Sequence, residues 1–153
     1  MNLNEALNVR ANEIEKPPAL PAGTYTWAVS GPHTQRATNN GDWDIIEFPL
    51  VAVEASDDVD PEALEAFGSL SAARNRLSFM FSTDPAKKAD NDRTVYRLKR
   101  FLLDTLRVEA EPDATLRELL AAAPNMQFRG QAKWRPADDG EIYVDVANPM
   151  PLA

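Results

Sequence analysis

Hydrophobic and polar residues alternate along five segments of the chain, a pattern typical of β-strands that bury one face. The predicted strands cover residues 24–30, 42–53, 74–81, 125–135 and 141–146. In the third strand, Leu77, Phe79 and Phe81 fall on one face, and Arg76 and Met80 fall on the other. The chain is therefore predicted to be rich in antiparallel sheet.

Turn signals separate these strands. The polar stretch 34–41 closes on Asn39-Asn40-Gly41, and we expect a loop there that returns the chain into an antiparallel partner. Asp138-Asp139-Gly140 predicts a hairpin between the last two strands. Pro49 cannot donate to a ladder, so it predicts an edge position or a bulge in the second strand.

Two segments have apolar side chains at helical spacing. One helix is predicted from Arg93 to about Arg107, with Asp92 as its N-cap. A second follows Thr115 and ends before Pro124. A short helix can also begin at Asp60-Pro61. The element order is therefore three strands, a helical insertion and a two-stranded hairpin.

This order predicts a mainly β (α+β) fold, an OB-like five-stranded Greek-key barrel with helices inserted between strands 3 and 4. A split β-sandwich is the competing architecture. We expect one domain at 23–148, with an acidic loop or short helix at 54–70 and the helical insertion at 92–123. Residues 1–22, which end in a proline-rich stretch, are predicted to be an extended arm, and 149–153 a short tail.

The 153 residues include no cysteine and one histidine, and their formal net charge is −8. Thiol chemistry and disulfides are thereby excluded, and a reducing compartment is expected. No signal-peptide pattern or membrane-spanning run is present, so we expect a cytoplasmic protein with no membrane partner, in the host cytoplasm if the chain is phage-encoded.

Charge is unevenly distributed along the chain. Nine basic and four acidic residues lie within 70–107, whereas 54–66 holds six acids and no base. A locally basic surface on an acidic protein is therefore expected. The acidic run is read as a solvated loop, or alternatively as a mimic of phosphates.

The run Leu20-Pro21-Ala22-Gly23-Thr24-Tyr25, the later Asn40-Gly41 turn and the strand Ile45-Ile46-Glu47-Phe48 resemble the opening of bacteriophage single-stranded-DNA-binding and recombination-associated proteins with OB-folds. The helical segment 96–102 and the glycine of Phe128-Arg129-Gly130 are also similar to that family. The resemblance covers about residues 20–147. Many such proteins end in an acidic tail, which the residues Asn148 to Ala153 do not form, so recruitment of partners by that route is not expected.

Single-stranded nucleic acid is held by cations that follow the phosphates and by aromatic faces that stack on bases. The nucleic-acid-binding residues predicted on this basis are Arg36, Trp43, Arg74, Arg76, Lys87, Lys88, Arg129, Lys133, Trp134 and Arg135. If Phe128 and Trp134 face the core, Arg129, Lys133 and Arg135 share the opposite face. Tyr25, Trp27 and Tyr143 are further aromatic candidates, and for Tyr25, Trp27 and Trp134 the alternative is a place in the core.

The sequence contains no phosphate-binding loop, nucleophile elbow or catalytic triad spacing, and we expect no enzyme, cofactor or metal. His33 is interpreted as a loop residue. Asp42 and Asp44, with Glu47 nearby, are read as ordinary strand residues, a divalent-ion site being the alternative.

The predicted function is sequence-nonspecific binding of single-stranded DNA in phage replication or recombination. Replication or recombination proteins are expected as further partners, and a homo-oligomer is possible. The alternative is a protein-interaction or virion assembly module, or an inhibitor that imitates nucleic acid through its acidic loop.

Overall fold

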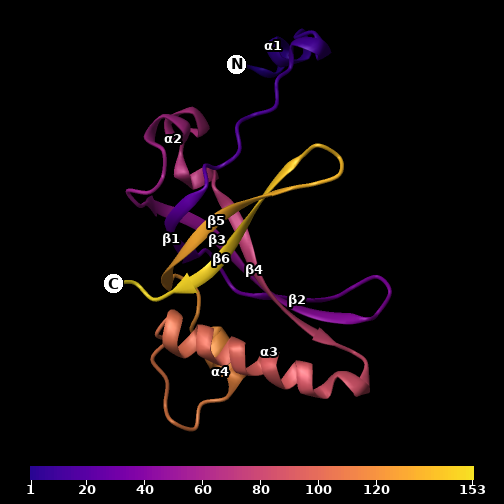
Figure 1. Cartoon of the computed structure of the whole chain (residues 1–153), viewed down its shortest axis with the longest axis vertical. Helices are drawn as coiled ribbons and strands as arrows, with labels where there is room; N and C mark the ends of the chain where they lie inside the picture. The colour runs from indigo at the N-terminus through magenta and orange to yellow at the C-terminus, as the bar shows by residue number, and fades with distance from the viewer.

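Each of the five predicted strands is present in the computed structural model, which describes residues 1–153, and a sixth strand lies between the first two (Figure 1). The strands are β1 (Gly23–Val29), β2 (Thr34–Ala37), β3 (Trp43–Ala55), β4 (Arg74–Ser82), β5 (Gln127–Pro136) and β6 (Ile142–Met150). All of the paired strands are antiparallel. The prediction of a β-rich α+β fold is confirmed.

The long strand β3 organises the sheet. Its last residues pair with β1 and its first residues pair with β2, and β4 pairs with it on the other side. β1 also pairs with β5, and β5 pairs with β6. In Figure 1 the β2–β3 hairpin and the β5–β6 hairpin both extend from the body of the molecule on the same side.

The sixth strand corrects the predicted loop at 34–41. Thr34–Ala37 pairs with β3, and the turn is confined to the residues that follow. The N–H of Thr38 donates to the carbonyl of Trp43, and Gly41 adopts a φ of +73°, which favours glycine. The sequence gives no strand signal at 34–37 because all four side chains are exposed and three of them are polar.

The helices are α1 (Leu3–Leu7), α2 (Pro61–Phe67), α3 (Lys88–Arg100) and α4 (Leu116–Ala121), and α3 continues as a π-helical segment over Phe101–Thr105. Short 3₁₀ turns cover Ala11–Glu13, Leu70–Ala72 and Pro85–Lys87. No helix combines the length and the apolar character needed to cross a bilayer.

Helix α3 begins at Lys88 and not at Arg93, so the prediction of Asp92 as its N-cap is wrong. Asp84 caps the preceding 3₁₀ turn by accepting from the N–H of Ala86. The carboxylate of Asp92 instead pairs with Lys88 one turn earlier on the helix surface, with an N–O distance of 2.9 Å. Lys87 and Lys88 therefore belong to the start of the helix.

The core lies between the sheet and the segment formed by α3 and its π-helical end. Trp27, Phe48 and Phe128 are fully buried in it. The ring of Phe101 lies 5.3 Å from the rings of both Phe48 and Phe128, measured between centroids. Leu98 and Leu102 are also fully buried, so this part of the predicted apolar helix face packs on the sheet as expected, whereas Val95 of the same predicted face is 42% exposed.

The end of the predicted arm is part of the packed structure. Leu20 is buried, its carbonyl accepts a hydrogen bond from Trp134 Nε1 at 2.7 Å, and the carbonyl of Pro21 accepts one from the hydroxyl of Tyr25. At the other end of the chain, β6 continues to Met150, past the predicted boundary at residue 148.

Candidate nucleic-acid interface

Three of the predicted cations lie together on β2 and β4. Arg36 on β2, and Arg74 and Arg76 on β4, each pair with an odd-numbered residue of β3. Paired residues of neighbouring strands project to the same side of a sheet, and on β3 the even-numbered Phe48 and Leu50 face the core. The three arginines therefore lie on the side that faces away from the core. We call this side of Arg36, Arg74 and Arg76 the arginine face.

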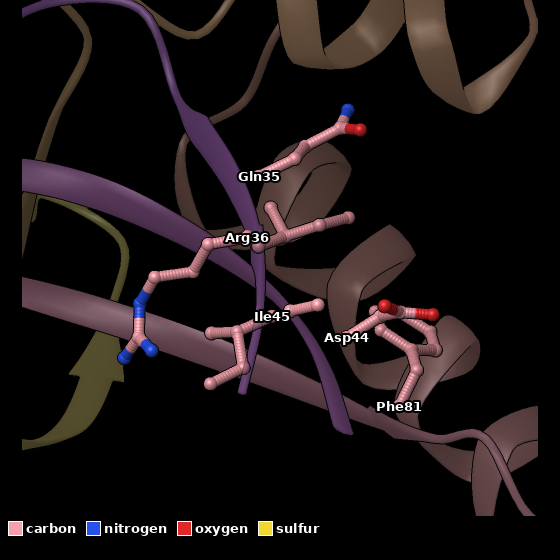
Figure 2. Close-up of a pocket in the computed structure, with 7 residues that line it drawn as sticks. Gln35, Arg36, Asp44, Ile45 and Phe81 are labelled. Carbon is pink, nitrogen blue, oxygen red and sulfur yellow. The ribbon is translucent and has the colours of Figure 1, made fainter. Parts of the chain in front are cut away.

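Figure 2 shows the β2 end of this arrangement, where Arg36 and Gln35 extend to opposite sides of the strand. Asp44 and Phe81 lie away from the guanidinium of Arg36 in the same view. Asp44 and Glu47 have opposite parity on β3, which separates their carboxylates. No group of three or more potential ligands among histidine and acidic side chains is close enough to hold a metal ion.

Glu47 lies at the centre of the arginine face. Its Oε1 accepts from Nε of Arg36 at 3.1 Å and from Nη2 of Arg36 at 2.8 Å, and its Oε2 accepts from Nη1 of Arg76 at 3.4 Å. The Glu47 side chain is 9% exposed, whereas those of Arg36 and Arg76 are 51% and 68% exposed. Both guanidinium groups are therefore fixed from behind and remain open to solvent in front.

Burial favours the protonated form of Glu47, but hydrogen bonds and the positive charges of Arg36 and Arg76 outweigh it and hold the pKa below its ordinary value. The carboxylate is therefore ionised at neutral pH. Two positive charges face one negative charge, and Arg74, which forms no ion pair, adds a third positive charge beside them. The arginine face is positive on a protein whose formal net charge is negative.

Replacing Glu47 by glutamine is expected to lower the free energy of unfolding by about 1 kcal/mol at neutral pH, a small effect because water screens the exposed arginines. The folded pKa lies below the ordinary value of 4.5, so the contribution of Glu47 is complete above that pH and is lost as the pH falls through the folded pKa. Urea denaturation of both proteins at about pH 7 and about pH 3 measures this difference. If Glu47→Gln lowers the free energy of unfolding equally at the two pH values, the stabilising role of the ionised Glu47 carboxylate is contradicted.

A polar pocket of about 310 Å³ opens on the arginine face beside Glu47. Its lining comprises Thr34, Glu47, Pro49, Arg74, Asn75 and Arg76, with no large apolar side chain. Guanidinium donors with a hydroxyl nearby are groups that bind phosphate oxygens in proteins. The chemistry of the pocket therefore suits an anionic ligand.

Trp43 supplies an aromatic surface at the edge of the arginine face. It begins β3 opposite Ser82 and shares the parity of Glu47, so its indole projects to the same side of the sheet. The side chain is 40% exposed, and Met80, opposite Ile45 on this same side, is 42% exposed. Trp43 is thus the predicted aromatic residue that lies on the same side of the sheet as the arginines, and it is nearest to Arg36, whose partner Ile45 is two residues away on β3.

The predicted cations of β5 form a second group. Arg129, Lys133 and Arg135 share one side of the strand as expected, opposite the fully buried Phe128. Arg135 donates through Nε to Asp145 at 2.8 Å, and its guanidinium lies over the ring of Tyr143 at 5.2 Å. The hydrogen bond and the charge of Asp145 raise the pKa of Arg135. One of the three cations is therefore already neutralised within the hairpin.

Trp134 and the two lysines lie apart from these groups. Trp134 is half exposed, so it does not face the core, and its Nε1 bond to Leu20 holds the indole beside the proline-rich stretch, away from Lys133 and Arg135. Lys87 and Lys88 are exposed at the start of α3. Tyr25 and Trp27 are fully buried, which leaves no ring face for a base.

Part of the acidic segment 54–66 holds the fold together. Asp58 accepts from the N–H and the hydroxyl of Thr24, and these bonds lower its pKa. Asp60 caps α2 by accepting from the N–H of Glu62. Two of the six acids therefore accept hydrogen bonds that stabilise the fold.

The sequence matches no known protein family and no curated protein.

The residues that sequence reasoning missed are Glu47 as the anchor of two arginines and Met80 beside Trp43. A signal for Glu47 was present, since an acid flanked by Ile45, Ile46 and Phe48 in a strand is placed where burial demands a cationic partner. Which cation supplies that partner depends on strand register, and no local pattern encodes it.

Proposed function

We propose that this chain is a sequence-nonspecific single-stranded-DNA-binding protein that acts in phage DNA replication or recombination. The observation that carries the proposal is the arginine face, where three outward arginines and the exposed indole of Trp43 share one side of β2, β3 and β4. Cations beside an aromatic platform are the combination that holds single strands.

We further propose that the strands form an OB-like barrel. β1 lies at the centre, flanked by β3 and β5, and β4 and β6 are the outer partners of these two. The side-chain amide of Asn75 on β4 donates to the carbonyl of Val144 on β6 at 2.7 Å, which supports an approach of the two outer strands. This strand order supports a five-stranded Greek-key arrangement, with β2 as an extension of the first hairpin.

The mechanism follows from the groups available. Guanidinium groups contact phosphates, which are common to every sequence, and an indole stacks on any base. Neither contact reads base identity. The negative charge carried elsewhere on the surface disfavours binding to acidic regions and favours binding that starts at the arginine face.

Fluorescence anisotropy of a labelled oligothymidine of about 16 nucleotides, titrated across a salt series, tests the proposal. If each arginine of the face neutralises one phosphate, the logarithm of the binding constant should fall with the logarithm of salt concentration, and these three contacts should account for about −2 of the slope. Duplex DNA of equal length should bind more weakly, because its bases are not free to stack.

Equal affinity for duplex and single strand would contradict the stacking part of the proposal. Absence of binding at low salt would contradict the proposal as a whole and would favour the protein-interaction alternative.

A further inference from the structure

A groove of about 420 Å³ lies between β4 and α3, next to the arginine face. Its lining comes from β4, from α3 with its π-helical end and from Pro149 of β6, and the charged groups in it are Arg97, Arg100 and Asp104. Leu77, Ser78, Phe79 and Tyr96 are its other principal residues. Ser78 follows Arg76 by two residues on the outward side of β4, a separation of about 7 Å along a strand. The groove therefore begins where the arginine face ends.

The edge of β4 that borders this groove is not paired with another strand. At the C-terminal end of this edge, the backbone groups of Ser82 are occupied by Asn91. The Asn91 side chain accepts from the N–H of Ser82 and donates to its carbonyl. Near the other end, the N–H of Arg76 donates to the side chain of Asn75. In an antiparallel strand alternate residues direct their backbone groups to the same edge, so Ser78, between these two, turns its N–H and carbonyl toward the groove.

The α3 side of the groove carries an exposed aromatic ring and a cation without an acidic partner. Tyr96 is 58% exposed, and the guanidinium of Arg100 lies 6.0 Å from its ring centroid. The guanidinium of Arg97 lies 5.9 Å from the ring centroid of Phe79 and donates to the hydroxyl of Thr94 at 3.5 Å, but it forms none of the ion pairs of the structure. Arg100, by contrast, is paired with Asp104 at 3.2 Å. Arg97 is therefore the cation on this wall whose charge is not balanced by a carboxylate.

We propose that the bound single strand continues from the arginine face over the free edge of β4 into this groove, where a base stacks on Tyr96 and a phosphate contacts Arg97. The inference rests on the proposed function and adds a second subsite to it. The continuity of the groove with the arginine face, the open backbone of Ser78 and the unpaired charge of Arg97 each suit a nucleotide. The site then takes more nucleotides than the arginine face alone holds.

The length of the oligonucleotide separates the two subsites. The full chain and the variants Tyr96→Ala and Arg97→Ala are titrated with labelled oligothymidines of about 6 and about 16 nucleotides. Lys99→Ala is the matched control, since it removes one charge from the same helix but lines a separate groove with Val95 and Leu103. All three side chains are exposed, so folding should be retained.

Tyr96→Ala and Arg97→Ala are each expected to bind the longer oligonucleotide about tenfold more weakly than the unchanged chain does, and to bind the shorter one with an affinity within about twofold of it. Arg97→Ala should also reduce the magnitude of the salt slope for the longer oligonucleotide by about 0.7, whereas Tyr96→Ala should leave the slope unchanged. Lys99→Ala should match the unchanged chain with both oligonucleotides.

Unchanged affinity of Tyr96→Ala and Arg97→Ala for the longer oligonucleotide, with binding by the parent chain intact, would overturn the second subsite and leave the proposed function standing. Equal losses in Lys99→Ala would also overturn it, because they would show a general charge effect. Absence of binding by the parent chain would overturn the proposed function and this inference together.

Discussion

Truncating Phe48 to alanine is expected to lower the free energy of unfolding by about 3–5 kcal/mol. The ring is fully buried, and its centroid lies 5.9 Å from that of Phe79 on β4 and 5.3 Å from that of Phe101 after α3. It therefore connects β3, β4 and the helical layer, and its removal leaves a cavity that neighbours from three elements cannot fill. Urea denaturation followed by circular dichroism measures the loss.

Val53→Ala is the matched control on the same strand, because Val53 is 46% exposed. Its effect should stay within about 0.5 kcal/mol. A loss below about 1 kcal/mol for Phe48→Ala would contradict the packing described for the core.

Replacing Arg36, Arg74 and Arg76 together by alanine is expected to weaken binding of oligothymidine by about a thousandfold at low salt. Each charged hydrogen bond to a phosphate contributes about 1.5 kcal/mol or more, which corresponds to about tenfold in affinity for each contact. The salt slope should also fall in magnitude by about 2, from the loss of three phosphate contacts. Anisotropy titrations across a salt series measure both quantities.

A control variant with the same change in net charge distinguishes the effect of the arginine face on binding from the effect of the protein's overall charge. Arg10, Arg93 and Arg117 lie on the N-terminal segment, α3 and α4, and their replacement by alanine should change affinity by less than about threefold. Glu47→Gln should act in the opposite direction and strengthen binding, because it removes the negative charge that competes with phosphate for Arg36 and Arg76. Equal losses in the two triple variants would contradict a local site.

The strands and the core were predictable because their signals are local. Alternation placed the five long strands, and the helical spacing of Leu98, Phe101 and Leu102 identified the face that packs on the sheet. The same alternation correctly placed Arg74 and Arg76 on one side of β4. β2 was missed because a strand whose four side chains, three of them polar, are all exposed has no apolar period to detect.

The bounds of helices and strands were less predictable, as was the position of a single aromatic residue inside or outside the core. The predicted extended arm holds the short helix α1, whose capping box, in which Asn2 and Glu5 satisfy each other's backbone N–H, the prediction overlooked. Trp134 has the parity of Phe128, but it lies beyond the end of the core and is held instead by the carbonyl of Leu20. That contact joins residues 114 positions apart, so no local pattern reports it.

The most direct test of the central claim, that the arginine face with Trp43 holds single-stranded DNA, is the fluorescence of Trp43 during titration with oligothymidine. The variant Trp134→Phe leaves Trp43 as the exposed indole, and the fully buried Trp27 serves as an internal reference. Saturable quenching that weakens as salt is added is the predicted result, because stacking and phosphate contact occur on the same face. Fluorescence that stays constant while anisotropy shows the oligonucleotide to be bound would contradict the claim and place the DNA elsewhere on the molecule.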